Sequence, residues 1–385
     1  MAGSIEKRGK ESWRLVASGG RGSDGKRIKH TRSIKAKSKR EAEKELAKFV
    51  AEIERGSYIE PSKITLSDFS SRWLKDYGEK SLSPTTLKRY REYLESRILP
   101  ALGHFKLEQV KPLHLLEFYN NLQEDGIRAD GKNGGLSEQT ILHHHRLISA
   151  MFQDAVEWQL LAMNPATNVK PPKVNKKKME YYDEAETKHL LELVLFEKPK
   201  YKLLINMAIS TGLRKGELLG LEWSHVDFDE KLIHVVQSSL YVSGKGIITK
   251  APKNESSKRT ISIPSKIVIL LKEYKAHQNE QRLQVGDLWN NSNRLFTTWD
   301  GDPIHPSTIN NWFRKFIRRN NLKPIPFHGL RHTAATLLIQ KGVHVKTISN
   351  RLGHTNISTT MDIYGHALKS SDQEAADKLN DVFTV

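Results

Sequence analysis

The chain contains no cysteine, no long apolar run and far fewer acidic than basic residues. The absence of cysteine excludes disulfide bonds and thiolate metal sites, and is typical of intracellular proteins. No apolar run approaches the roughly 18 residues of a membrane span, and the polar, charged N-terminus lacks the apolar core of a signal peptide. We therefore expect a cytoplasmic protein that does not contact the membrane.

The excess of basic residues favours a polyanionic partner. The 385 residues hold 62 Lys/Arg and 44 Asp/Glu, for a formal net charge of +18 and a pI near 9.7. Residues 1–40 alone hold 13 Lys/Arg and 3 Asp/Glu. Clustered Lys and Arg gain affinity for nucleic acid by releasing counterions from its phosphates. A basic protein without such a partner remains the alternative.

Residues 1–56 predict a small basic module. Ser12–Ser18 and Lys26–Lys35 alternate as strands do, and a helix follows from about Ser38. A short sheet backed by one helix could contact a DNA groove. A charged, partly disordered arm is the alternative, because so small a sheet has little core. The candidate DNA contacts in this module are Arg14, Lys26, Arg27, Lys29 and Arg32.

Residues 65–168 predict an all-α bundle of four helices. The first is expected from Ser67, the second after the Ser83-Pro84 cap, the third over Pro112–Gly126 and the fourth over Ser137–Leu160. Lys88 and Arg89 on the second helix are candidate DNA contacts, although a solvated helix face explains them as well.

Residues 170–178 mark a domain boundary, because proline and like charges keep this stretch extended. Its Lys176, Lys177 and Lys178 could lie along DNA. Residues 179–385 then mix helical and strand patterns, which predicts an α+β domain with a small antiparallel sheet and helices at positions such as Asp183, Ser265 and Ser307.

Separate short motifs in this last part suggest phosphate chemistry. They are Thr211–Leu218, His328–Thr333, Leu352–Thr355 and Asp362–His366. Guanidinium groups stay charged and form two parallel hydrogen bonds to phosphate, so the arginines of these motifs could stabilise a phosphodiester under attack. His328 and His332 are spaced as zinc ligands are, but Gly329 stands where the metalloprotease glutamate would be. We expect no metal site.

These motifs, in this order and spacing, resemble the signature boxes of tyrosine recombinases, specifically the integrases of phages and conjugative elements. The resemblance extends over residues 180–366. It also implies that residues 1–56 are an arm-type DNA-binding domain with a three-stranded sheet plus helix, and that 65–168 are the core-binding domain. The domain from 179 to 385 would be catalytic.

The resemblance also implies residue roles. Tyr364 would be the nucleophile that joins the 3′ phosphate of the cut strand, and Arg214 and Arg331 would hold that phosphate. His328 would assist proton transfer and His354 would hydrogen-bond the phosphate. The general acid would be a lysine in a hairpin: Lys253 fits best, although Asn254 replaces the usual threonine, and Lys250 and Lys258 are competitors.

The implied function is site-specific integration and excision of a mobile element through a Holliday junction, without metal or other cofactor. The implied partners are double-stranded DNA with core and arm sites, three further copies of the chain in a homotetramer, and candidate excisionase and host DNA-bending proteins. The C-terminal tail could pack in cis or in trans. A type IB topoisomerase-like nicking-closing enzyme and a catalytically silent DNA-binding regulator are the alternatives.

Overall fold

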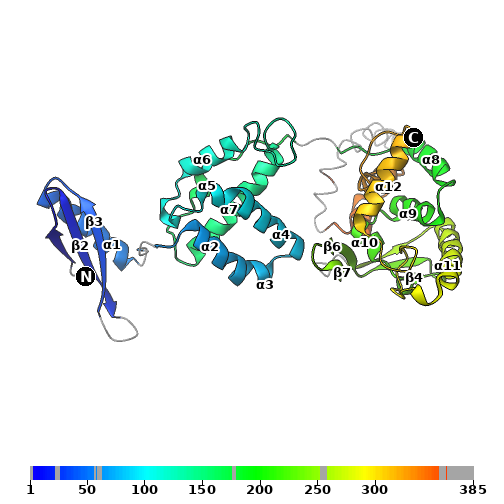
Figure 1. Ribbon diagram of the computed structural model, residues 1–385, viewed down its shortest axis with the longest axis horizontal. Coiled ribbons are helices and arrows are strands. Elements are labelled where there is room, and N and C mark those ends of the chain that lie inside the picture. Colours follow the sequence, from blue (N-terminus) through cyan, green and yellow to red (C-terminus); the bar gives the residue numbers. More distant parts are fainter. Residues whose placement is uncertain are drawn as a thin grey trace, which may run out of the picture. The chain divides into compact units, whose positions relative to one another are not determined.

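The computed structural model describes residues 3–21, 27–55, 58, 63–175, 179–251, 258–354 and 361. The chain separates into two compact units, residues 1–176 and 177–385. Their elements are labelled in Figure 1. Within the described ranges, no helix is both long and apolar enough to cross a membrane.

The N-terminal module is a three-stranded antiparallel sheet with one helix, as the sequence predicts. The strands β1 (Gly3–Lys7), β2 (Ser12–Arg21) and β3 (Arg27–Lys35) lie in the order β1-β2-β3, and α1 (Lys39–Glu54) packs on β2. Alternate β2 residues Trp13, Leu15 and Ala17 are buried. Because side chains of a strand alternate between faces, this leaves the other face of the sheet open.

An all-α bundle follows, which confirms the predicted class. Its larger helices are α2 (Leu66–Trp73), α4 (Pro84–Tyr93), α6 (Pro112–Asn121) and α7 (Glu138–Glu157); the shorter segments are η1 (Leu74–Gly78), α3 (Glu79–Ser81), η2 (Leu94–Ile98), α5 (Leu99–Leu102), η3 (Leu107–Gln109) and η4 (Pro165–Asn168). Ser83 caps α4 and Ser137 caps α7, each accepting a backbone N–H of the first turn. The third helix ends at Asn121, five residues before the predicted end.

The second unit is α+β, but its strands form two sheets rather than the one predicted. The strands β4 (Val226–Asp227), β5 (Leu232–Val235) and β8 (Arg259–Ser262) form the first sheet, and β6 (Ser238–Val242) and β7 (Gly246–Lys250) form a separate hairpin. Gln237 lies where β5 gives way to β6. Its Nε2 atom donates to the carbonyl of Gly220 and to Glu222 Oε1, each at 2.7 Å, and so ties the connection between the two sheets to the end of α10.

The helix α9 (Pro199–Thr211) is central to this unit and contacts four other helices: α8 (Glu184–Val194), α10 (Lys215–Gly220), α11 (Ser265–Val285) and α13 (Gly329–Gln340). Figure 1 shows α9 between α8 and α11. The remaining elements are α12 (Pro306–Arg319), α14 (Val345–Leu352), η5 (Trp223–His225) and η7 (Gly286–Leu288). The C-terminal end of α9 leads directly into the first sequence motif.

Candidate active site

The turn between α9 and α10 fixes the backbone of Arg214. Gly212 ends α9 in the left-handed conformation, with φ +66°, and a Cβ at this position would lie 2.5 Å from Leu352 Cδ2. Only glycine meets both conditions without strain. Arg214 then caps α10, where its backbone N–H donates to Glu217 Oε2 at 2.9 Å.

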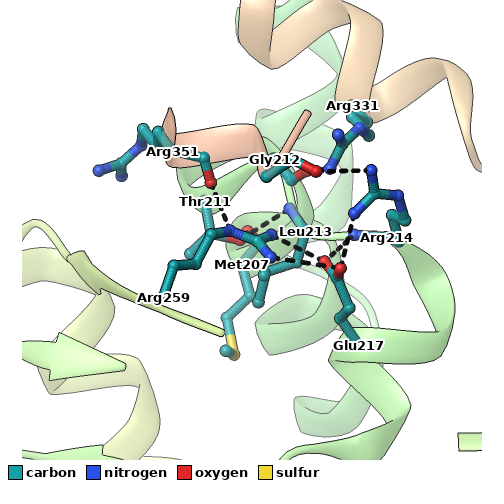
Figure 2. Close-up of polar contacts among 10 residues, drawn as sticks. Met207, Thr211, Gly212, Leu213, Arg214, Glu217, Arg259, Arg331 and Arg351 are labelled. Carbon is teal, nitrogen blue, oxygen red and sulfur yellow. Dashed lines mark hydrogen bonds and ion pairs between the residues drawn. The ribbon is translucent and has the colours of Figure 1, made fainter. Parts of the chain in front are cut away.

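The side chain of Arg214 is held at two points and still reaches solvent. Its Nη1 atom lies 2.8 Å from Glu217 Oε1, and its Nη2 atom donates to the carbonyl of Gly353 at 2.9 Å (Figure 2). The side chain is 40% exposed, whereas that of Glu217 is only 9% exposed. Arg214 is therefore an oriented cation at the surface of the unit.

Arg331 approaches the same place from α13. It is buried, and its Nη1 atom donates to the carbonyl of Gly212 at 2.8 Å. Figure 2 shows the two arginines on the same side of the cluster. Each is thus hydrogen-bonded to the carbonyl of a helix-ending glycine, Gly212 for Arg331 and Gly353 for Arg214, and both glycines have positive φ.

Three histidines adjoin this pair in an uncharged state at neutral pH. Loss of solvation, followed by the charges of Arg331 and Arg214, lowers the pKa of His328 at the start of α13 and lowers the pKa of His354 to about 4. Burial, followed by His328 and Arg331, lowers the pKa of His332 to about 4. The positive charge for a phosphate must therefore come from the arginines, while His328 is available to accept a proton.

The described part of the site thus brings together Arg214 from the start of α10, His328 and Arg331 from the start of α13, and His354 just after α14. Tyr364 and Lys253 lie outside the described residues, as do Lys26, Lys176, Lys177 and Lys178. The competing lysines flank the connection that contains Lys253: Lys250 ends β7, and Lys258 precedes β8. These two strands belong to different sheets.

Among the residues that the structure describes, no group of three or more His, Asp or Glu side chains could hold a metal ion. The three consecutive histidines 143–145 do not form such a group, because their side chains have different surroundings. His144 is buried and its ring stacks on that of Tyr93, with ring centres 4.3 Å apart, whereas His145 Nδ1 lies 3.1 Å from the Tyr119 hydroxyl. His328 and His332 have perpendicular rings 5.3 Å apart.

The predicted DNA contacts of the N-terminal module divide between two faces. Strand alternation puts Arg14, Arg27 and Lys29 on the open face. Arg32 lies on the helix-covered face, where its Nη2 atom is 2.6 Å from Glu52 Oε2 and its guanidinium lies 4.5 Å from the Phe49 ring centre. The alternation of the sequence already separates Arg32 from the others, because Arg32 is two positions from the half-buried Ile34 and so lies on the same face of the strand.

In the helical bundle, Lys88 forms a long i,i+4 ion pair with Glu92, at 3.8 Å. Arg89 lines a small surface pocket. The rings of Tyr93 and His143 and the guanidinium group of Arg146 also line it. Arg146 is not among the predicted contacts, because nothing in the sequence of α7 distinguishes it from a solvated cation on a helix.

The known proteins that this chain resembles are integrases and other tyrosine recombinases. A model of the phage integrase family matches residues 180–371, and a model of the phage integrase N-terminal SAM-like domain matches residues 65–123. A tyrosine recombinase XerC-like protein of Caldanaerobacter subterraneus subsp. tengcongensis is 31% identical over 98% of this chain and 98% of its own. The ICEBs1 integrase of Bacillus subtilis is 33% identical over 64% of this chain and 67% of its own.

A solved structure shares the fold. The Tn1549 transposon integrase in complex with a circular intermediate DNA superposes with a TM-score of 0.69, at 20% sequence identity, over 82% of this chain and 100% of the solved one.

Proposed function

Because the chain belongs to the phage integrase family of tyrosine recombinases, we propose that it uses Tyr364 and the Arg214–Arg331 site to integrate and excise a mobile element. It is a site-specific DNA recombinase, and its reaction is the cleavage and rejoining of DNA strands. The proposal concerns which residues carry out each step and which assembly does so.

The observation that supports this proposal best is the arginine pair. In-line attack on a phosphodiester develops negative charge on the non-bridging oxygens, and fixed guanidinium groups stabilise that charge without reorganising. Arg331 is buried and Arg214 is oriented but partly exposed, and the proposal is that one phosphate group contacts both. The neighbouring histidines are neutral and do not compete for this role.

The proposed chemical step combines these arginines and His328 with Tyr364 and Lys253, which lie outside the described residues. The phenolic oxygen of Tyr364 attacks the phosphorus, its proton passes to His328, and the 5′ oxygen of the next nucleotide leaves. That oxygen takes a proton from a lysine of the β7–β8 connection, for which Lys253 is the first candidate and Lys250 and Lys258 are the others. The 3′-phosphotyrosyl bond retains the energy of the broken bond, so a 5′ hydroxyl from another duplex can attack it without ATP.

Neutral His354 follows Gly353 directly and can donate a hydrogen bond to a non-bridging oxygen. A neutral imidazole carries both one donor and one acceptor nitrogen. Its ring is half-buried, so it also limits the access of water to the phosphorus.

Exchange between two duplexes requires four strand cleavages, so we propose that four copies of the chain act together on a Holliday junction. Residues 65–168 and 179–385 would contact the core site and residues 1–56 the arm sites, with an excisionase and a host DNA-bending protein as further partners, in the cytoplasm. Deleting residues 1–56 should weaken integration and spare cleavage of an isolated core site. A truncated protein that does not cleave would contradict this division.

The test of the nucleophile uses a nicked attachment-site duplex, from which the short leaving strand diffuses away and traps the adduct. The protein should form a covalent complex on denaturing gels, and Tyr364→Phe should bind the duplex equally well without forming one. Peptide mapping that places the DNA on another residue would overturn the assignment. Plasmid relaxation without exchange between two sites would instead indicate a topoisomerase-like activity, and binding without an adduct would indicate a regulator.

A further inference from the structure

Arg259 begins β8 and is buried behind the arginine pair, with a side chain only 8% exposed. Its guanidinium contacts two other elements. The Nη2 and Nη1 atoms lie 2.8 and 3.3 Å from the two carboxylate oxygens of Glu217 on α10, and the Nε atom donates to the carbonyl of Arg351 on α14 at 2.8 Å (Figure 2).

The same guanidinium lies against Gly353. A Cβ built on Gly353 would be 2.7 Å from Arg259 Nη1 and 2.9 Å from Cζ, so only glycine leaves room for it. Arg214 is held by exactly these two neighbours, because it bonds to Glu217 Oε1 and to the Gly353 carbonyl. Arg259 therefore lies against both residues that orient Arg214, although the two arginines come from different elements.

The charge of Glu217 lies between those of Arg259 and Arg214 and affects both. Glu217 is buried, and burial alone would raise its pKa; the hydrogen bonds and charge of Arg259, followed by those of Arg214, outweigh burial and lower it. The carboxylate is thus ionised beside Arg214. With Arg214 as its sole partner, it would neutralise that arginine and repel an incoming phosphate. A second guanidinium offsets the carboxylate and leaves the charge of Arg214 available.

We propose that Arg259 is a positioning residue for strand cleavage. It neutralises Glu217 and fixes the end of α14, so that Arg214 faces the scissile phosphate with its full positive charge. This inference rests on the proposed role of Arg214 in holding that phosphate. Arg259 itself does not contact the DNA in this arrangement.

The first experiment compares three variants in single-turnover formation of the covalent complex on the nicked duplex. Arg259→Gln should slow the reaction by about 100-fold, because the charge of Glu217 then falls on Arg214 alone and neutralises it. The double variant Glu217→Gln/Arg259→Gln should react about tenfold faster than Arg259→Gln, because no carboxylate then remains to neutralise Arg214. Arg259→Lys should lie between Arg259→Gln and the wild type, since an ammonium keeps the charge but cannot match both oxygens.

The second experiment separates electrostatics from folding. A methylphosphonate at the scissile position carries no negative charge, so its cleavage depends less on the charge of Arg214. The defect of Arg259→Gln relative to wild type should shrink from about 100-fold on phosphodiester to about tenfold or less on methylphosphonate. A folding defect alone would reduce both reactions equally.

Arg294→Gln is the matched control. Arg294 is also buried and also contacts a carboxylate and a carbonyl, with Nη1 at 3.6 Å from Glu222 Oε1 and bonded to the Gly220 carbonyl. It does not contact Glu217 or Gly353 in any described hydrogen bond. This variant should lower the melting temperature as Arg259→Gln does, without a substrate-dependent defect in cleavage.

The outcomes are distinguishable. A folded Arg259→Gln protein that cleaves at the wild-type rate, or a defect of equal size on both substrates, overturns the role of Arg259. Wild-type protein that forms no covalent complex on either substrate overturns the proposed function instead.

Discussion

Arg214 donates a hydrogen bond from Nη2 to the carbonyl oxygen of Gly353, 2.9 Å away and 139 positions further along the chain. This bond joins the start of α10 to the end of α14. The Gly353 carbonyl is available because the residue adopts a left-handed conformation, with φ +68°, and ends its helix. An arginine with an otherwise exposed side chain thereby acquires a fixed direction beside His354.

Replacement of Arg214 by alanine should abolish cleavage while sparing most DNA affinity. One of the two guanidinium groups proposed to bind the phosphate is lost, and a loss of about 10² to 10³ in rate is typical for removal of a charge-stabilising group. We expect most phosphate contacts to come from other surfaces of the protein, so duplex binding should change little. Covalent-complex formation and gel-shift affinity measure the two quantities. An equal loss of both would contradict the assignment.

Arg282→Ala is the control for this substitution, because Arg282 is an exposed arginine in the last turn of α11. It removes the same charge from the same unit, and cleavage should continue at the wild-type rate.

Gly353→Ala should damage both stability and cleavage. Alanine in a left-handed conformation costs about 1 to 2 kcal/mol. The added Cβ would also lie 2.7 Å from Arg259 Nη1 and force that guanidinium away from its partners. We expect a lower melting temperature and a cleavage rate reduced by about tenfold or more.

Gly342→Ala separates the two effects. Gly342 also has positive φ, +74°, but a Cβ there would meet no atom within 4 Å. The backbone cost is the same, so this variant should lose similar stability and keep its cleavage rate. If both alanine variants cleave equally well, the contact between Gly353 and Arg259 has no role in the reaction.

Acidification should destabilise the unit that contains His332. The pKa of this buried histidine is about 4 in the folded chain against an ordinary 6.5. Between these values the unfolded chain binds a proton that the folded chain does not. The contribution of His332 to the free energy of unfolding is therefore fully present above pH 6.5 and is lost as the pH decreases toward 4. The free energy of unfolding should decrease by about 2 kcal/mol from pH 7 to pH 5.

Urea unfolding at these two pH values measures the effect, and His332→Gln should show a weaker pH dependence than the wild type. Half-buried His354 adds a contribution of the same sign. A variant with unchanged pH dependence would show that His332 is not the group responsible.

The open face of the N-terminal sheet should bind DNA and the helix-covered face should not. Arg14→Ala removes one cation from the open face, so the slope of log affinity against log salt concentration should fall by about 1. Arg32→Ala should leave that slope unchanged and lower the stability of the module, because Arg32 pairs with Glu52 and lies over Phe49. Fluorescence anisotropy on a duplex at several salt concentrations tests both; equal slopes for the two variants would contradict the assignment.

The sequence by itself determined the features that depend on near neighbours along the chain. The cap at Ser83-Pro84 and the Asp183–Glu186 capping box begin helices where predicted, because these interactions span at most four residues. The alternation of β2 likewise places Trp13 and Leu15 in the core. The order of the motifs was enough to suggest the family and to nominate Arg214 and Arg331.

Tertiary structure alone decided which distant groups meet. Nothing local to Arg259 indicates a partner 42 positions away in Glu217, or that Gly353 must lack a side chain for Arg259 to fit. The division of the strands into two sheets is likewise a tertiary feature, and Gln237 between β5 and β6 bonds to the distant Gly220 and Glu222. Local propensity acts over a few residues, whereas these contacts exist only once packed helices and strands bring remote backbone carbonyls and buried charges within bonding distance.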